Sequence, residues 1–225
     1  METLNGNAYS DPFPHLILEN FYNEEELELV WEELKYYTKP GKLLEPKDFG
    51  GVVDKTNSHA IALDAVYIND RRNKVDYRKL SNILTVNRKL FLPEILEPFA
   101  KIHDCCSVAP MATYDVTKIR YYHDEEYYDA HIDKTFQFLA FSYFYKEPKK
   151  FEGGELYFPD YIDIDALTCE NNMTIIFPGW VQHGVRTVTI KDSDYYDGFG
   201  RYAITSFMSC IDNEKRNFQG LNKKD

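Results

Sequence analysis

Hydrophobic positions in the first hundred residues recur mainly at helical spacing. An extended segment with a short strand is predicted at residues 12–18. Asn23 is a predicted helix N-cap, because it precedes three glutamates that suit the positive end of a helix dipole. The apolar stripe that follows consists of Leu27, Val30, Trp31 and Leu34. Further helices are predicted over residues 77–92 and from Pro93 onward, and their apolar sides should pack on a core.

Residues 39–76 show no clear period, and glycine and proline interrupt them repeatedly. A stretch of this length without regular spacing is often a functional loop. We therefore expect it to form a lid, together with the turns at residues 123–127 and 191–198.

After Pro110 the pattern changes to short, aromatic-rich runs between turn signals. The predicted strands cover residues 113–122, 127–132, 136–145, 154–158, 174–177, 181–190 and 199–210. Helices followed by strands predict an α+β fold with an antiparallel sandwich or jelly roll of about eight strands. No linker is visible, so we expect one domain: helical support and lid in residues 1–110, the jelly-roll core in 111–211 and a tail in 212–225.

The composition fits a globular chain that buries a substantial core. Of the 225 residues, 44% are hydrophobic and 16% are aromatic. No run of about 18 apolar residues predicts a membrane span, and the N-terminus lacks the layout of a signal peptide. We therefore expect a cytoplasmic protein without a membrane partner. The four cysteines lack zinc-site spacing and are predicted to be free thiols: Cys105, Cys106, Cys169 and Cys210.

The net charge of −11 bears on the partner class. An acidic surface disfavours nonspecific binding to a phosphate backbone, and no long block of Lys or Arg is present. A nucleic-acid partner is therefore not expected. The oligomeric state stays open.

His131 and Asp133 form the most informative pair in the sequence. They lie in a Tyr- and Ile-rich segment predicted to be a strand, where residues i and i+2 point to the same face. An imidazole and a carboxylate side by side are two of the three ligands of a two-His-one-carboxylate site for non-heme Fe(II). The alternative is a surface histidine near an acidic residue, because His-x-Asp occurs by chance in many proteins.

His183 is the candidate third ligand. It follows the turn at Pro178-Gly179 and begins a predicted strand, 50 residues beyond Asp133. Three ligands on one face would leave positions for a bidentate ligand and O2. His15, His59 and His103 have no carboxylate partner on a predicted strand, and the turn around His123 suggests a solvated side chain.

Arg201 opens an otherwise apolar, aromatic strand 18 residues after His183. Burying a guanidinium there without an anion would be costly, and its planar fork can clamp a carboxylate. A dicarboxylate could therefore chelate the metal at one end and meet Arg201 at the other. The alternative is an arginine at the sheet edge that reaches solvent. Arg186, three residues after His183, should face the opposite side and be exposed.

The order of these motifs resembles the Fe(II)- and 2-oxoglutarate-dependent dioxygenases, specifically the prolyl 4-hydroxylase-like branch. The matching segments are Arg120-Tyr121-Tyr122, Tyr128-x-x-His131-x-Asp133, Glu152-Gly153-Gly154-Glu155 and His183-Gly184-Val185. The resemblance implies a double-stranded β-helix (cupin-like jelly roll) in which His131, Asp133 and His183 bind iron. It also implies that Tyr122 and Tyr128 line the pocket for 2-oxoglutarate and substrate.

The basic residue that would anchor 2-oxoglutarate departs from this branch, which typically uses a lysine about ten residues after the distal histidine. Lys191 lies at eight, and we predict that Arg201 takes the role instead.

The resemblance implies an oxidoreductase that hydroxylates an unactivated C–H bond with O2 and releases succinate and CO2. Asp133 favours hydroxylation over halogenation, because halogenases of the superfamily lack this carboxylate. A prolyl residue in a peptide or protein is the first candidate substrate, and a free amino acid or other small metabolite is the second. Ascorbate is a candidate reductant. A non-catalytic jelly-roll binding protein is the alternative from another class, and it predicts no Fe(II) binding.

Overall fold

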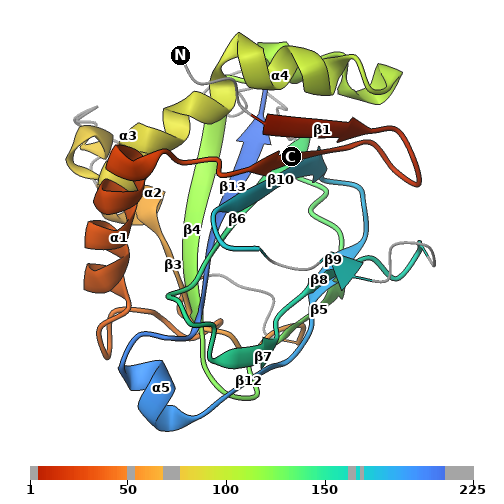
Figure 1. The fold of residues 1–225 in the computed structure, drawn as a ribbon. Helices are drawn as coiled ribbons and strands as arrows, with labels where there is room; N and C mark the ends of the chain where they lie inside the picture. The colour runs from red at the N-terminus through yellow and green to blue at the C-terminus, as the bar shows by residue number, and fades with distance from the viewer. Residues whose placement is uncertain (1–4, 50–53, 68–76, 162–165, 168–169, 211–225) are drawn as a thin grey trace, which may run out of the picture.

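The computed structural model describes residues 5–49, 54–67, 77–161, 166–167 and 170–210, and it places the strands in antiparallel sheets (Figure 1). The large sheet has seven strands, in the order β1 (Asn5–Tyr9), β2 (His15–Glu19), β10 (Met173–Pro178), β6 (Phe138–Phe144), β13 (Arg201–Ser209), β4 (Tyr114–Tyr122) and β3 (Ala60–Ala62). The small sheet has four, in the order β5 (Tyr128–His131), β11 (His183–Val185), β8 (Leu156–Tyr157) and β9 (Ala166–Leu167). A separate pair joins β12 (Val188–Ile190) to β7 (Phe151–Gly153).

The chain alternates between the two main sheets after residue 113. It passes from β4 in the large sheet to β5 in the small one, back to β6, then to β8 and β9, and on through β10, β11 and β13. This alternation stacks the two sheets, and a buried cluster that includes Phe141, Phe177, Leu156 and Val185 fills the space between them. The antiparallel α+β arrangement predicted from the sequence is confirmed.

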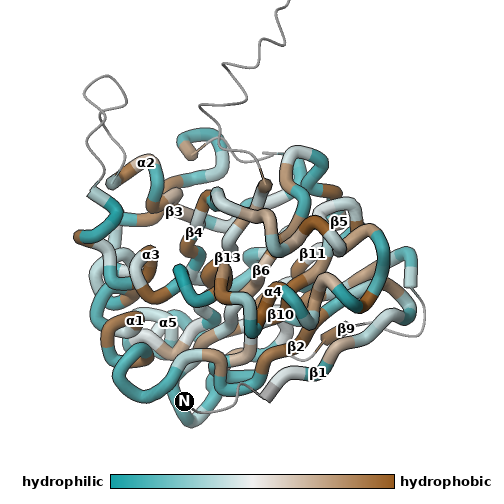
Figure 2. Tube along the Cα trace, turned by 90° about the horizontal axis from the view of Figure 1, so that it is seen from above, coloured by the Kyte–Doolittle hydropathy of each residue, from teal (hydrophilic) through white to brown (hydrophobic). Residues whose placement is uncertain are grey.

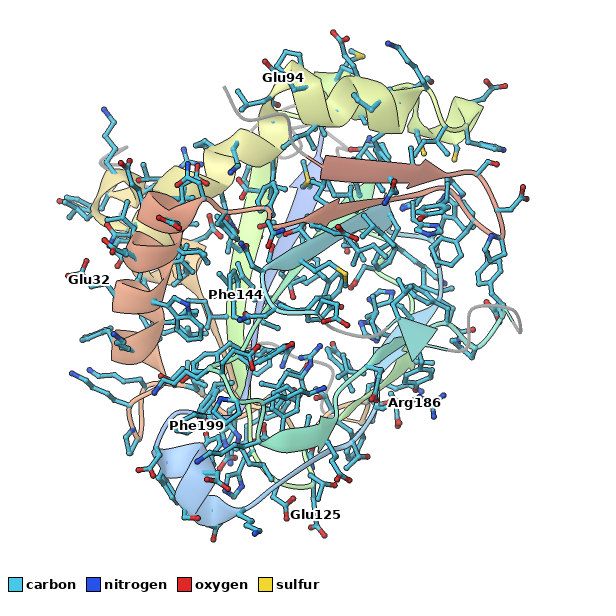
Figure 3. The ribbon with its side chains drawn as sticks, viewed as in Figure 1. Glu32, Glu94, Glu125, Phe144, Arg186 and Phe199 are labelled. Carbon is cyan, nitrogen blue, oxygen red and sulfur yellow. The ribbon has the colours of Figure 1, made fainter. Side chains whose placement is uncertain are left out.

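The strands β6, β10 and β13 are buried along their whole length, because both faces of the large sheet are covered. The small sheet covers one face, and a second buried cluster packs helices against the other. Hydrophobic stretches accordingly gather on the central strands, and hydrophilic segments lie at the periphery (Figure 2). Phe144 points into the helix–sheet core, whereas Glu32, Glu94 and Glu125 point outward (Figure 3).

Five helices accompany the sheets within the described residues: α1 (Glu24–Tyr37), α2 (Leu63–Tyr67), α3 (Asn82–Val86), α4 (Pro93–Ala100) and α5 (Asp192–Tyr196). The N-cap predicted at Asn23 is confirmed as part of a capping box, in which Asn23 and Glu26 each accept a hydrogen bond from the other's backbone N–H. Short 3₁₀ turns at Arg78–Leu80 and Asn87–Phe91 flank α3, so the predicted helical region 77–92 is three consecutive short elements.

Some segments differ from the prediction. The run predicted at 181–190 is two strands, because Arg186 leaves the ladder and its N–H donates to Glu155 O instead. The irregular segment 39–76 contributes β3 and α2, and the predicted loop 191–198 contains α5. Parts of the predicted lid, at 50–53 and 68–76, lie outside the described residues, as does the predicted tail 212–225.

No helix within the described ranges is both long and apolar enough to cross a membrane. Three of the four cysteines lie in described segments, and all three are free thiols: Cys105, Cys106 and Cys210. Cys169 lies outside these segments.

Candidate metal centre

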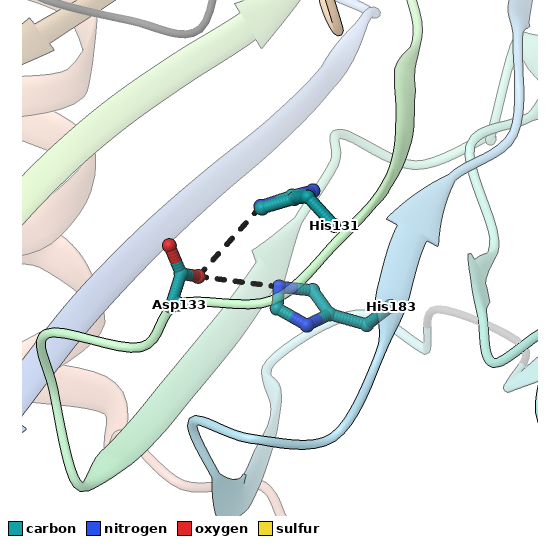
Figure 4. A group of neighbouring side chains, drawn as sticks. All are labelled: His131, Asp133 and His183. Atoms are coloured by element: carbon teal, nitrogen blue, oxygen red, sulfur yellow. Dashed lines mark ion pairs between the residues drawn. The ribbon is translucent and has the colours of Figure 1, made fainter.

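The two histidines predicted as ligands meet across one strand pair of the small sheet. His131 is the last residue of β5 and His183 the first of β11, and the two are register partners with ring centroids 4.6 Å apart. Asp133 follows β5 in a turn whose backbone is fixed by a 3.0 Å hydrogen bond from Asp133 N–H to Gly179 O. Strand pairing and this turn together bring the three side chains to one point (Figure 4).

The donor atoms face one another at distances suited to a shared ion. Asp133 Oδ2 lies 3.7 Å from His131 Nε2 and 3.5 Å from His183 Nε2 (Figure 4). One donor atom from each residue lies within 4.8 Å of the others. These separations are too long for good hydrogen bonds, but they match ligands arranged around one cation.

The far side of each imidazole sets its tautomer. His131 Nδ1 lies 2.9 Å from Asp129 O, and His183 Nδ1 lies 2.9 Å from Val181 O. A carbonyl oxygen only accepts, so each Nδ1 carries the proton and donates. Each Nε2 then has a free lone pair and faces Asp133. Metal-bound histidines are commonly oriented in this way, by a hydrogen bond from the other ring nitrogen.

Two of the donor atoms are buried without a hydrogen-bond partner: Asp133 Oδ2 and His183 Nε2. Burying such atoms unsatisfied is costly, so their convergence calls for a cation between them. Two imidazoles and one carboxylate with open positions match the facial site of non-heme Fe(II). The residues therefore fit a divalent metal.

The electrostatic setting keeps His131 and Asp133 in the forms that bind a metal. Burial, with a smaller contribution from His183, lowers the pKa of His131 to about 4, so its ring is neutral near pH 7. Burial alone would raise the pKa of Asp133, but the two imidazoles and Lys118 outweigh it and hold that pKa below its ordinary value. The site therefore offers the neutral imidazole of His131 and the carboxylate of Asp133 near neutral pH.

Arg201 lies in the same cavity as the three ligands. It opens β13, is 1% exposed, and holds its guanidinium between the rings of Tyr122 and Tyr143 at 4.6 and 4.8 Å. Aromatic faces on both sides fix the direction of the planar fork. This burial excludes the alternative of an arginine that reaches solvent at the sheet edge.

Gly154 explains why the Gly-Gly turn is needed beside this arginine. Its φ is +75°, and a Cβ built there would lie 2.4 Å from Arg201 Cδ. Only glycine adopts this backbone conformation readily and leaves the space that the arginine side chain fills. The turn therefore shapes the position of Arg201.

The cavity between the sheets is narrow and enclosed, with a volume of about 20 Å³. Among the described residues its lining joins the three ligands and Arg201 to Arg120, Tyr122, Tyr128, Phe141, Val185, Ala203, Thr205 and Phe207. Both tyrosines predicted to line the pocket are present, and Tyr128 stacks on His131 at 4.0 Å. A dicarboxylate would require lining side chains to move apart.

The competing candidates lie elsewhere. Lys191 is exposed at the start of α5 and is not among the residues that line the cavity. Arg186 is exposed, as predicted, and points away from the centre of the molecule (Figure 3). His59 and His123 each pair with a carboxylate, Glu126 at 2.5 Å and Asp192 at 3.0 Å, and neither joins the ligand group.

Sequence reasoning gave Lys118 and Arg120 no role, yet both lie beside the site. Residues 118, 120 and 122 alternate along β4 and share one face. A cation inside an aromatic strand is costly to bury without an anion, and this holds for Lys118 and Arg120 as it does for Arg201. That signal could have identified them.

No protein-family model matches the chain, and no curated protein gives a significant match. Among solved structures, a prolyl 4-hydroxylase from Pseudomonas putida matches with a TM-score of 0.52 and 12% identity, over 87% of this chain and 91% of that one. A prolyl 4-hydroxylase structure from Phytophthora capsici matches with the same TM-score and identity, over 87% of this chain and 58% of that one. The resemblance predicted from the motifs is thus confirmed at the level of the fold, which this chain shares with prolyl 4-hydroxylases.

Proposed function

We propose that the protein is an Fe(II)- and 2-oxoglutarate-dependent dioxygenase that hydroxylates an unactivated C–H bond, with succinate and CO2 as coproducts. The observation that carries the proposal is the convergence of His131, Asp133 and His183 in one cavity with buried Arg201. The alternation of strands between two stacked sheets supports the double-stranded β-helix expected for such an enzyme.

Each residue has a distinct part in this reaction. His131, Asp133 and His183 would hold the metal, and Arg201, between Tyr122 and Tyr143, would receive the far carboxylate of 2-oxoglutarate. Bound Fe(II) would supply the activation of O2 and the attack on the C–H bond. Tyr128 and the apolar lining would orient the substrate and exclude water from the site.

Two substrate classes follow from different observations. The prolyl residue of a peptide or protein is the first candidate, because the motifs and the fold resemble prolyl 4-hydroxylases. A free amino acid or other small metabolite is the second, and the narrow, enclosed cavity favours it, since a peptide needs an open groove. Ascorbate as reductant and a cytoplasmic location stay predictions.

Succinate formation from 2-oxoglutarate with Fe(II) tests the proposal. The assay is run over proline-rich peptides, free L-proline and other amino acids. We expect one of these classes to stimulate succinate formation, and we expect His131→Ala and Asp133→Ala to abolish the stimulated reaction. The matched control is His123→Ala, which removes a histidine with a carboxylate contact outside the site.

Unchanged succinate formation in His131→Ala or Asp133→Ala would contradict the assignment of these residues as metal ligands. A protein that neither binds Fe(II) nor consumes 2-oxoglutarate would instead support the non-catalytic binding protein.

A further inference from the structure

We propose that the substrate carries a carboxylate and that Lys118 and Arg120 receive it beside the metal. The inference rests on the proposed function and specifies its substrate class. It starts from two cations that the metal and 2-oxoglutarate leave unused.

The register of the large sheet places Arg120 on the wall of the site and Lys118 next to it along β4. On β4 and β13, Lys118 pairs with Thr205, Arg120 with Ala203 and Tyr122 with Arg201. Arg120, Tyr122 and all three β13 partners line the metal cavity. The alternation of a strand directs Lys118 to the same side, two residues beyond Arg120. A row of cations therefore runs along this wall, away from the position assigned to 2-oxoglutarate.

Arg120 is fixed against the ligands. It is 5% exposed, and its Nη1 donates to Ser58 Oγ at 2.7 Å and to Ser58 O at 3.3 Å. Its guanidinium lies 4.9 Å from the ring of Tyr128, which itself stacks on His131 at 4.0 Å. The cation is therefore one aromatic ring away from a metal ligand, with only Nη1 engaged in a hydrogen bond among the described residues.

Lys118 has no such anchor. Its ammonium lies over the rings of Phe207 and Phe49, at 5.0 and 5.6 Å, and it forms no hydrogen bond or ion pair with any described residue. Burial and the neighbouring Arg120 lower its pKa, and Asp133 opposes them. A half-buried ammonium held between aromatic rings is poorly solvated, so an incoming anion would stabilise it.

With the metal and 2-oxoglutarate bound, the site would leave the charges of Lys118 and Arg120 uncompensated. Asp133 is the single acidic residue among the described residues that line the cavity, and it would serve the metal. The two carboxylates of 2-oxoglutarate would be taken by the metal and by Arg201. Lys118 and Arg120 would then face the substrate with no counter-charge, and this favours an anionic substrate over a neutral one.

A small carboxylate-bearing molecule, such as a free amino acid, fits this arrangement. A prolyl residue inside a peptide has no carboxylate next to its ring. A peptide could supply a carboxylate only through an acidic residue next to the proline. The carboxylate could therefore come from a free amino acid or from such a peptide, and an experiment can separate the two.

The test compares each compound with its neutral amide. Succinate formation is measured with L-proline and L-prolinamide, with other amino acids and their amides, and with proline peptides that carry Asp or Asn beside the proline. Binding of the same pairs is measured by calorimetry in oxygen-free protein that holds Mn(II) and 2-oxoglutarate. We expect the carboxylate member of a pair to bind roughly 10- to 100-fold more tightly than its amide.

Variants assign the effect to the two residues. Lys118→Met and Arg120→Gln should each weaken binding of the carboxylate compound by about 10-fold or more, leave binding of the amide unchanged and leave the Kd of 2-oxoglutarate unchanged. Arg120→Gln keeps a donor for Ser58, and unfolding curves show whether either variant is folded. Lys191→Met, on the exposed start of α5, is the matched control.

Three outcomes would overturn the inference. If the enzyme forms succinate but binds the carboxylate and amide members of each pair equally tightly, Lys118 and Arg120 do not form an anion site for the substrate. Loss of 2-oxoglutarate affinity in Arg120→Gln or Lys118→Met would assign these residues to the cosubstrate. A protein that binds neither metal nor 2-oxoglutarate would overturn the proposed function first, and the inference with it.

Discussion

At the scale of single residues, the position of Arg201 depends on the absence of a side chain at Gly154. The Gly154 backbone lies against the arginine side chain, and two tyrosine rings hold the guanidinium from either side. The pattern Glu152-Gly153-Gly154-Glu155, noted in the sequence only as a family marker, therefore has a steric reason to lie beside the candidate anion site.

Gly154→Ala should weaken 2-oxoglutarate binding by roughly 10-fold or more, because the new methyl group would displace Arg201 Cδ. Calorimetry with the metal-loaded protein measures the change. Gly41→Ala is the control: its φ is also positive, at +76°, but a Cβ there meets nothing within 4 Å. Equal loss of affinity in both variants would show that backbone strain, and not contact with Arg201, is responsible.

Asp64 gives the molecule a pH dependence that is separate from the metal site. Burial raises the pKa of Asp64 to about 6, although one carboxylate oxygen accepts a 2.6 Å hydrogen bond from Thr117 N–H. Its other oxygen is buried without a partner. The folded state thus binds this proton more tightly than the unfolded state, where the pKa is about 3.9. Stability from this group is present below about pH 4 and is lost as pH rises toward about 6.

Asp64→Asn should remove this loss, because the amide oxygen can still accept from Thr117 and no charge is buried. As pH rises from 4 to 6, we expect the free energy of unfolding of the variant to increase by on the order of 2 kcal/mol relative to that of the wild type. Urea unfolding at several pH values measures the difference, and the exposed Asp48→Asn is the control. A constant difference across this range would contradict the account.

At the scale of elements, Glu33 joins α1 to two further helices across the outer face of the large sheet. This buried residue of α1 accepts hydrogen bonds from Ser81 Oγ at 2.8 Å and from Ile83 N–H at 2.7 Å, at the start of α3. Tyr67 OH of α2 donates to the same carboxylate at 3.2 Å. One side chain therefore satisfies donors from two further helices.

Glu33→Ala should lower the free energy of unfolding by roughly 2–4 kcal/mol, because it leaves buried donors without their acceptor. Glu32→Ala is the matched control. Glu32 is exposed, and among the described residues its side chain accepts a single 3.3 Å hydrogen bond, from Asn82, so its effect should be within about 0.5 kcal/mol. Chemical denaturation of both variants measures the two changes in the free energy of unfolding. Similar values for the two would mean that Glu33 does not link the helices.

The sequence predicted long elements well and short ones poorly. Helix α1 has a cap and a repeating apolar stripe, and β4, β6 and β13 have enough residues to reveal their character. By contrast, β3 and α2 have three and five residues, too few to establish a period, and their contacts with β4 decide their conformation. The convergence of His131, Asp133 and His183 was predictable because their spacing is local or marked by a turn. The narrowness of the cavity depends on side-chain packing between the sheets, and a local sequence pattern does not predict such packing.

At the scale of the whole molecule, the site spans both stacked sheets. The three candidate metal ligands come from the small sheet and the turn that follows β5, whereas Arg201 and Arg120 come from the large sheet. Sheet packing therefore sets the distance between the candidate metal centre and Arg201. The chain carries a net charge of −11, yet Arg120 and Arg201 make this cavity wall cationic, so anions are favoured there.

The central claim is that one metal and one dicarboxylate bind together between the sheets. Oxygen-free calorimetry of 2-oxoglutarate, with and without Fe(II), tests it most directly. We predict one binding site per chain that requires Fe(II), is lost in His131→Ala, weakens roughly 10- to 100-fold in Arg201→Gln and is unchanged in Lys191→Gln. Binding that is equally tight without metal, or that is unaffected by Arg201→Gln, would contradict the account.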